Sequence, residues 1–167
     1  DGEGGGDVDF LFEVHVGRAP VDSEAEAANF VRKTLEYEVA GGSVLRNVLL
    51  VGEYLGFGGE YDWGGNLNDM IRDGSTRYIE TTGFLNSAYG EFFQVSTLYD
   101  RDASGRRWNP SSLVEALQRG VHIVNHVGHA DSSTVMKLTS AEIDALSRSS
   151  YFFRHTQSSY SASFDNH

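Results

Sequence analysis

Three polar residues that together could carry out acyl transfer each follow a short apolar stretch of this sequence: Glu53, His129 and Ser159. Acyl transfer needs a nucleophile, a base that takes its proton and a group that orients the base, and these residue types supply the three functions. The chain contains 6 histidines and many serines, so such a triple also arises by chance. The triple is therefore a hypothesis, and its test is whether the fold brings the residues together.

Small residues flank the histidine of this triple. Gly128 and Ala130 would leave room for a substrate carbonyl to approach His129. We expect the backbone N–H groups of Ala130 and Ser159 to form an oxyanion hole, a feature whose removal typically costs about 10²–10³ in rate.

Short β-rich runs alternate with amphipathic segments, and this alternation predicts an α/β layer fold with a largely parallel sheet. Ser23 and Thr139 each have a glutamate three residues later, which indicates a capping box, and Asn109 precedes a proline at the first helical position. Strands are expected at 10–16, 48–52, 92–98, 121–127 and 151–155, and helices at 23–38, at 67–72, from 109 and from 139. Ligands collect at the carboxyl ends of parallel strands, so neighbouring strands would bring the three polar residues to one edge.

Composition narrows the class of protein. The 167 residues suit a single domain spanning 1–167, and the formal net charge of −11 argues against nucleic-acid binding. The absence of cysteine excludes disulfides, thiolate metal sites and thiol chemistry in this chain as written. No apolar run approaches the roughly 18 residues of a membrane span. The chain opens in an acidic, glycine-rich loop, and we expect it to be part of a longer protein.

Five separated blocks of the sequence form a recognisable series. The first two are the segment around Val16-Gly17-Arg18 and the end of the following helix at Leu35-Glu36-Tyr37-Glu38. The third is the apolar run that ends at Glu53, the fourth is Gly128-His129-Ala130, and the fifth is Gln157-Ser158-Ser159-Tyr160-Ser161. In this order the blocks resemble the gingipain family of cysteine peptidases in the caspase-like clan, which usually has Gly-His-Gly in the fourth block and Gln-Gly-Cys-Tyr-Ser in the fifth.

The resemblance implies a caspase-like three-layer α/β/α fold and a role for each residue of the triple. His129 would be the catalytic histidine that protonates the leaving amine, Ser159 stands at the cysteine position, and Glu53 would orient or polarise His129. The substrate would be a peptide or protein cleaved after a chosen, often basic, P1 side chain, with a pocket in the region of Glu60, Asp62 and Trp63. The resemblance also implies secretion or a cell-surface location, and the earlier strands of the family fold precede this chain.

The sequence departs from the family at the nucleophile. A serine hydroxyl barely ionises at neutral pH, whereas a cysteine thiol has a reference pKa of about 8.5, so we expect most peptidase activity to be lost. Ser158 and Ala162 also replace glycines beside the nucleophile. Three readings stay open: a peptidase disabled at Ser159 by natural or engineered change, a non-catalytic peptide-binding pseudopeptidase, and a serine hydrolase that uses Ser159.

The sequence also contains candidate metal-binding residues. An acidic loop near the N-terminus consists of Asp1, Glu3, Asp7 and Asp9. It is either a solvated loop or, as the resemblance suggests, a structural calcium site, and its spacing is not that of an EF-hand. His122, His126 and His129 lie in an expected strand that would turn His129 away from the other two, which disfavours zinc. Catalysis itself would require no cofactor. The oligomeric state is left open.

The glycine-rich loop at 56–59 lacks the spacing of a nucleotide-binding motif. We interpret it as a substrate-side loop with an aromatic wall, or else as a local hydrophobic cluster. The aromatic residues concerned are Tyr54, Phe57, Tyr61 and Trp63.

Overall fold

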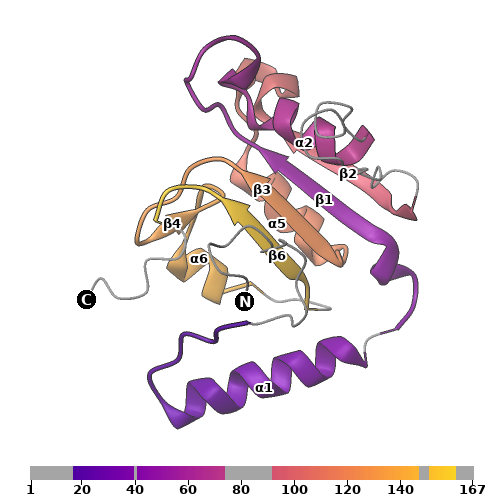
Figure 1. The fold of residues 1–167 in the computed structure, drawn as a ribbon, viewed down its shortest axis with the longest axis vertical. Coiled ribbons are helices and arrows are strands. Elements are labelled where there is room, and N and C mark those ends of the chain that lie inside the picture. Colours follow the sequence, from indigo (N-terminus) through magenta and orange to yellow (C-terminus); the bar gives the residue numbers. More distant parts are fainter. Residues whose placement is uncertain (1–16, 40, 74–91, 147–150, 161–167) are drawn as a thin grey trace, which may run out of the picture.

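A four-stranded parallel sheet forms the centre of the molecule (Figure 1). The computed structural model describes residues 17–39, 41–73, 92–146 and 151–160. The sheet order is β2-β1-β3-β6, with strands Gln94–Tyr99 (β2), Asn47–Gly52 (β1), Ile123–Val127 (β3) and Phe153–Gln157 (β6). A separate antiparallel pair consists of β4 (Thr134–Val135) and β5 (Leu138–Thr139). The α/β fold with a largely parallel sheet is therefore confirmed.

Helices cover both faces of the sheet, and this explains why β1 reads as a continuous apolar run rather than an alternating one. Helix α5 (Pro110–Gln118) buries Leu113 and Leu117 in one cluster with Leu49 and Val51 of β1. Helix α2 (Gly64–Asp73) packs against β1, β2 and β3 on the opposite face. The order α5, sheet, α2 is the layered arrangement that the resemblance implied.

Two consecutive glycines allow α2 to approach the sheet closely. A Cβ on Gly64 would lie 2.2 Å from the carbonyl oxygen of Val127, and one on Gly65 would lie 2.8 Å from the ring of Tyr99. The helix therefore begins at Gly64, three residues before the predicted start, because the backbone of these glycines itself contacts the strand ends. Glycine is unfavourable inside a helix, which is why the sequence pattern did not indicate this first turn.

A buried amide pair joins α2 to the sheet. Asn68, which has no exposed surface, donates from Nδ2 to the carbonyl oxygen of Val51 at 2.8 Å. Its Oδ1 accepts a hydrogen bond from Nδ2 of Asn125 at 2.7 Å, and Oδ1 of Asn125 lies 2.8 Å from Nδ1 of His155. Because buried polar groups are costly unless paired, this chain of hydrogen bonds fixes α2 over β1, β3 and β6.

Helix caps agree with the sequence signals. Helix α6 (Ser140–Asp144) begins with a complete capping box formed by Thr139 and Glu142. Asn109 caps α5 through the N–H group of Ser111. In α1 (Glu24–Glu38), Ser23 accepts from the Glu26 N–H group, but the Glu26 carboxylate accepts from the residue before the cap. Four 3₁₀ turns complete the described elements: Ser43–Arg46, Gly59–Asp62, Asp100–Asp102 and Ser104–Arg106.

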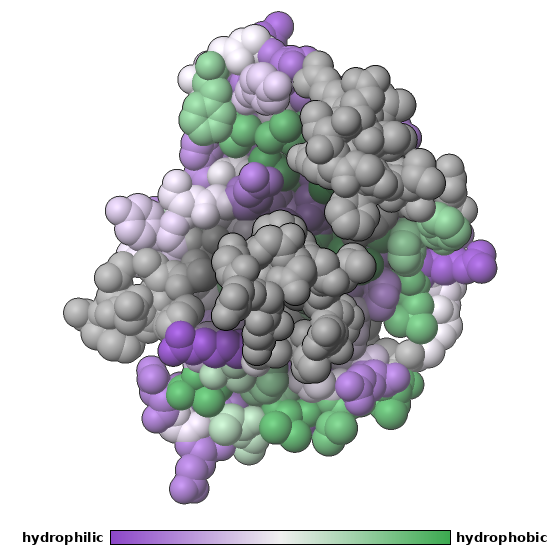
Figure 2. All heavy atoms as spheres, in the orientation of Figure 1, coloured by the Kyte–Doolittle hydropathy of each residue, from purple (hydrophilic) through white to green (hydrophobic). Residues whose placement is uncertain are grey.

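Helix α1 confirms the helix expected at 23–38, but its apolar side chains lie on the surface of the described structure. No residue of this helix is buried. Phe30, Val31 and Leu35 are 50%, 54% and 57% exposed, and Figure 2 shows apolar side chains along α1 at the lower edge of the view. The described contacts of α1 with the rest of the molecule include the stacking of Tyr37 on His122.

The strand expected at 10–16 lies outside the described residues. No helix of the described residues combines the length and the apolar character that a membrane crossing would need. The last strand ends at Gln157 rather than at 155, because its residues continue to pair with β3 as far as Val127.

Candidate active site

The sheet order places three of the strand ends identified in the sequence side by side. Strand β1 pairs with β3 up to Gly52 and Val127, and β3 pairs with β6 up to Val127 and Gln157. Glu53 directly follows the end of β1, and its backbone N–H donates to the carbonyl oxygen of Val127 at 3.0 Å. The adjacency that the sequence could not establish is therefore present in the fold.

His129 and Ser159 leave this edge of the sheet in parallel. Val127 and Gln157 are register partners in neighbouring strands, and His129 and Ser159 each lie two positions beyond that pair. Neighbouring strands are about 4.8 Å apart, so the two backbone segments emerge together. The Gly128 N–H group donates to the carbonyl oxygen of Gln157 at 3.2 Å, which continues the pairing past the last ladder residues.

Ser159 lies in an exposed turn immediately after β6. The next residue, Tyr160, has a φ angle of 54°, a left-handed conformation that is uncommon for residues other than glycine. Ser159 is therefore exposed at a sharp strand-to-turn transition at the carboxyl edge of the sheet, whereas the hydroxyl oxygen of Ser158 is buried.

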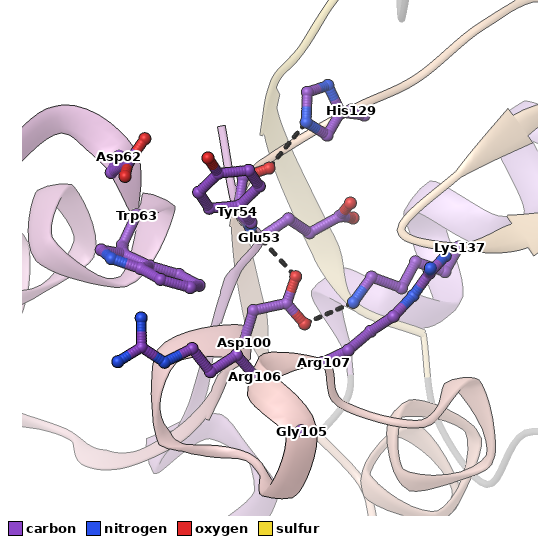
Figure 3. A pocket seen from close by; sticks show the side chains of 10 residues that line it. All are labelled: Glu53, Tyr54, Asp62, Trp63, Asp100, Gly105, Arg106, Arg107, His129 and Lys137. Carbon is purple, nitrogen blue, oxygen red and sulfur yellow. Dashed lines mark hydrogen bonds and ion pairs between the residues drawn. The ribbon is translucent and has the colours of Figure 1, made fainter. Parts of the chain in front are cut away.

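A cavity of about 580 Å³ opens at the same edge (Figure 3). It collects Glu53, His129, Asp62 and Trp63, which the sequence analysis had singled out. Glu60 and Ser159, although both are described, are not among the residues that line it. The other lining residues are Tyr54, Asp100, Gly105, Arg106, Arg107 and Lys137.

Glu53 does not make the contact expected of it. Its Oε1 lies 2.9 Å from Nε2 of His126, whereas Nε2 of His129 lies 2.7 Å from the carbonyl oxygen of Tyr54. The predicted orientation of His129 by Glu53 is thus replaced by two separate contacts. The reason is directional: His126 is fully buried within β3 and points to the Glu53 carboxylate, which is 4% exposed, while His129 lies beyond the strand and is exposed.

Gly128 makes room for this buried pair. A Cβ at this position would lie 2.3 Å from Nε2 of His126 and 2.8 Å from Cδ of Glu53. From the sequence, His126 was considered only as a candidate metal ligand, and its buried hydrogen bond to Glu53 was not predicted. The signal that was available is a histidine inside a buried apolar strand, because a buried polar side chain requires a partner.

His129 is held in a defined tautomer by a backbone group. A carbonyl oxygen can only accept a hydrogen bond, so the nitrogen that faces Tyr54 must carry the hydrogen. Nε2 of His129 is therefore the anchored nitrogen, and Nδ1 is the acceptor nitrogen of the neutral ring.

Asp100 is a site residue that the sequence analysis did not identify. It directly follows β2, is 3% exposed and accepts hydrogen bonds from the backbone N–H groups of Tyr54 at 3.0 Å and Trp108 at 2.8 Å. Lys137 forms an ion pair with the same carboxylate. The available signal was its position two residues beyond the strand predicted at 92–98, which in the structure extends to Tyr99.

The expected aromatic wall is only partly formed. The rings of Tyr54 and Trp63 are 4.9 Å apart, and these residues form a bridge between the two sides of the loop. Phe57 and Tyr61 are 78% and 50% exposed and do not line the cavity.

The side chain of Asp62 accepts a hydrogen bond from the N–H group of Gly58. Gly58 has a φ of 85°, a backbone conformation that favours glycine.

Both signs of charge line the cavity. The guanidinium of Arg106 lies 5.6 Å from the centre of the Trp63 ring, and Asp62 lies on the other side of that ring (Figure 3). Arg107 lines the cavity towards Lys137. A substrate side chain entering this space would therefore meet an aromatic surface with a carboxylate and guanidinium groups nearby.

The predicted calcium loop is not tested by the structure, because its four acidic residues (Asp1, Glu3, Asp7 and Asp9) lie outside the described residues. Within the part of the chain that the structure describes, no group of three histidine, aspartate or glutamate side chains is placed to hold a metal ion.

Comparison with known proteins gives one match. The sequence model of peptidase family C25, the gingipain family of cysteine peptidases, matches residues 1–167. No curated protein and no solved structure matches the chain. The five blocks of resemblance, the parallel sheet and the full-length family match agree, and this chain belongs to peptidase family C25.

Proposed function

We propose that this domain is the core of a cysteine-type endopeptidase, in which Ser159 replaces the nucleophile and makes the chain inactive or nearly so. The observation that carries the proposal is the register of β3 and β6, which places His129 and Ser159 two residues beyond one parallel pair. A cavity that includes His129 adjoins them at the same edge. Family membership supports peptides or proteins as substrates.

The proposed mechanism proceeds through an acyl-enzyme. The side chain at position 159 gives its proton to Nδ1 of His129 and attacks the scissile carbonyl carbon. The carbonyl π electrons move to oxygen, where the N–H groups of Ala130 and Ser159 are the proposed oxyanion donors. The carbonyl re-forms as the C–N bond breaks, and the leaving amine takes the proton from Nδ1. Water then gives a proton to Nδ1 and adds to the acyl carbon, the bond between that carbon and residue 159 breaks, the proton returns to residue 159, and the acid product leaves.

The Tyr54 carbonyl supports this cycle in both protonation states of His129. It accepts the Nε2 hydrogen, which the ring carries whether or not Nδ1 holds the transferred proton, and so it keeps the ring in place through the cycle. Glu53, which lies at the cavity and pairs with His126, would act on the reaction only through the shape and electrostatics of the site.

Serine explains the proposed loss of activity. A thiol with a reference pKa of about 8.5 supplies thiolate readily, whereas a hydroxyl needs a base that removes its proton during attack. His129 is anchored by a carbonyl oxygen instead of a carboxylate, so it lacks the negative partner that makes the histidine of a serine hydrolase an effective base.

The cavity is the proposed P1 pocket, with Asp62 and Trp63 on its wall. Glu60 remains a proposed contributor, although its carboxylate belongs to the neighbouring turn and does not line the cavity. Secretion or cell-surface location, and a structural calcium ion at the N-terminal acidic loop, are proposals that rest on the family resemblance.

The experiment that tests this proposal measures hydrolysis by the Ser159→Cys chain of peptides whose P1 residue is basic, acidic, aromatic or small, with and without calcium. Cleavage that appears only in this variant supports a disabled peptidase and reveals its specificity. A folded variant that binds peptides without cutting them would instead favour the pseudopeptidase reading. Covalent labelling of Ser159 in the unmodified chain by a fluorophosphonate would favour the serine-hydrolase reading.

A further inference from the structure

We propose that Asp100 is a positioning residue for His129, acting through the backbone of Tyr54. This inference rests on the proposed function of His129, but its geometry is independent of which residue occupies position 159. Asp100 holds the N–H group of Tyr54, and the carbonyl oxygen of the same residue holds Nε2 of His129. The carboxylate therefore fixes the acceptor that selects the tautomer of the catalytic histidine.

The two oxygens of the Asp100 carboxylate have different partners. Oδ1 accepts from the Trp108 N–H group and from the ammonium group of Lys137. Oδ2 accepts from Tyr54 N–H at 3.0 Å. Hydrogen bonds to a carboxylate are roughly twice as strong as those between neutral groups, and Lys137 forms an ion pair with this buried carboxylate. One oxygen is thus anchored to the framework, and the other holds the residue that contacts His129.

Tyr54 is restrained on several sides, so a displacement at its N–H group reaches its carbonyl oxygen. Its ring packs on Trp63, and the following residue, Leu55, donates from its N–H to the carbonyl oxygen of Asp62 at 2.7 Å. The preceding Glu53 is bonded through its N–H to Val127. The Glu53–Tyr54 peptide is held on both sides, because the Glu53 carbonyl oxygen accepts from the Gly64 N–H group at 2.7 Å and the Tyr54 N–H group donates to Asp100. Asp100 is therefore one of the anchors that set the position of the Tyr54 carbonyl oxygen.

Asp100→Asn separates positioning from a merely structural role. The side-chain shape is unchanged, and the single amide oxygen is expected at the Oδ1 position, where two donors including a cation converge. The NH₂ group then faces the N–H group of Tyr54. Two donors cannot form a hydrogen bond, so the contact between residue 100 and the Tyr54 N–H group is lost. The matched control is Asp69→Asn on α2, which removes a carboxylate whose ion-pair partners are Arg72 and Arg101 and leaves the hydrogen bonds of Tyr54 and His129 in place.

The test is long-range ¹H–¹⁵N NMR of the histidine rings in the full chain with Ser159 in place, with the His129 signals assigned through His129→Gln. We expect the Nε2–H form of neutral His129 to predominate, and Asp100→Asn to lower the ratio of Nε2–H to Nδ1–H by about fivefold, the equilibrium effect of one net hydrogen bond. Asp69→Asn leaves the ratio unchanged. A folded Asp100→Asn chain with an unaltered tautomer ratio would overturn the proposal.

Two further measurements keep the proposal testable and distinct from the proposed function. Amide hydrogen exchange of Tyr54 in the unmodified chain should be slowed at least tenfold relative to an unstructured peptide, and exchange at the unstructured rate overturns the inference even if Asp100→Asn fails to fold. If Ser159→Cys is active, adding Asp100→Asn should lower kcat about tenfold, and an equal fall with Asp69→Asn overturns the inference. An inactive Ser159→Cys chain would refute the proposed function alone, because the NMR result does not depend on activity.

Discussion

Replacing Gly128 with alanine tests the buried Glu53–His126 pair, because the added methyl group has no free space. It would lie 2.3 Å from Nε2 of His126 and 2.8 Å from Cδ of Glu53, and both side chains are buried. Overpacking of this kind costs about 1–3 kcal/mol, and leaving a buried hydrogen-bonding group without its partner costs about 1–3 kcal/mol. Partial relaxation should bring the loss in free energy of unfolding to about 3 kcal/mol.

The measurement is urea unfolding at neutral pH, supported by thermal unfolding. For a domain of this size each kcal/mol lowers Tm by roughly 2–4 °C, so the expected fall is about 6–12 °C. The control is Gly17→Ala, because a Cβ at Gly17 meets no atom within 4 Å and alanine there should change stability by less than about 1 kcal/mol. Equal stabilities of the Gly128→Ala and Gly17→Ala chains would refute the packing argument.

Three other outcomes are expected. Asn68→Ala leaves the buried amide of Asn125 and a strand carbonyl without their partner, so unfolding in urea should show a loss of about 3 kcal/mol, and a loss below about 1 kcal/mol would contradict the described network. The N–H and hydroxyl groups of Ser133 lower the pKa of Asp131 below its ordinary 3.8, so its contribution to stability is present above that value and is lost as the pH falls through the lowered pKa. Asp131→Asn should therefore reduce the fall in urea midpoint between pH 5 and pH 2, and an unchanged pH dependence would refute this. Trp63→Ala in the cysteine-restored chain should raise KM about tenfold with little change in kcat, whereas an unchanged KM for every peptide would remove this wall from the substrate site.

Much of the fold was predictable because its signals are local. The capping residues Ser23, Asn109 and Thr139 begin helices at the expected positions. The apolar run of β1 indicates a strand buried on both faces, and the carboxyl-edge rule for parallel sheets then predicts where polar residues meet. The convergence of Glu53 and His129 at one cavity follows from these two facts.

The side-chain partners were not predictable in the same way. Residues 126 and 129 are separated by three positions, and only the end of β3 decides which histidine points to Glu53. Asp100 has no spacing signature, because its partners Tyr54 and Lys137 are 46 and 37 residues away. Such pairings depend on register and on the strand end, which periodicity does not specify.

Helix α1 shows a further limit of pattern reasoning. Its apolar stripe at Phe30, Val31 and Leu35 predicts burial, but in the described structure these side chains are exposed. An amphipathic pattern identifies the face that favours contact with apolar surface, and it does not identify what supplies that surface.

The measurement that tests the central claim most directly compares kcat/KM of the Ser159→Cys chain with that of the same chain carrying His129→Ala. General acid–base catalysis contributes about 10²–10⁴ in rate, so hydrolysis should appear when cysteine is restored and fall by at least about 10² when the imidazole is removed. Circular dichroism of both chains checks that they are folded. Hydrolysis that is insensitive to His129→Ala, or no hydrolysis by a folded Ser159→Cys chain, would contradict the assignment of this strand edge as a peptidase active site.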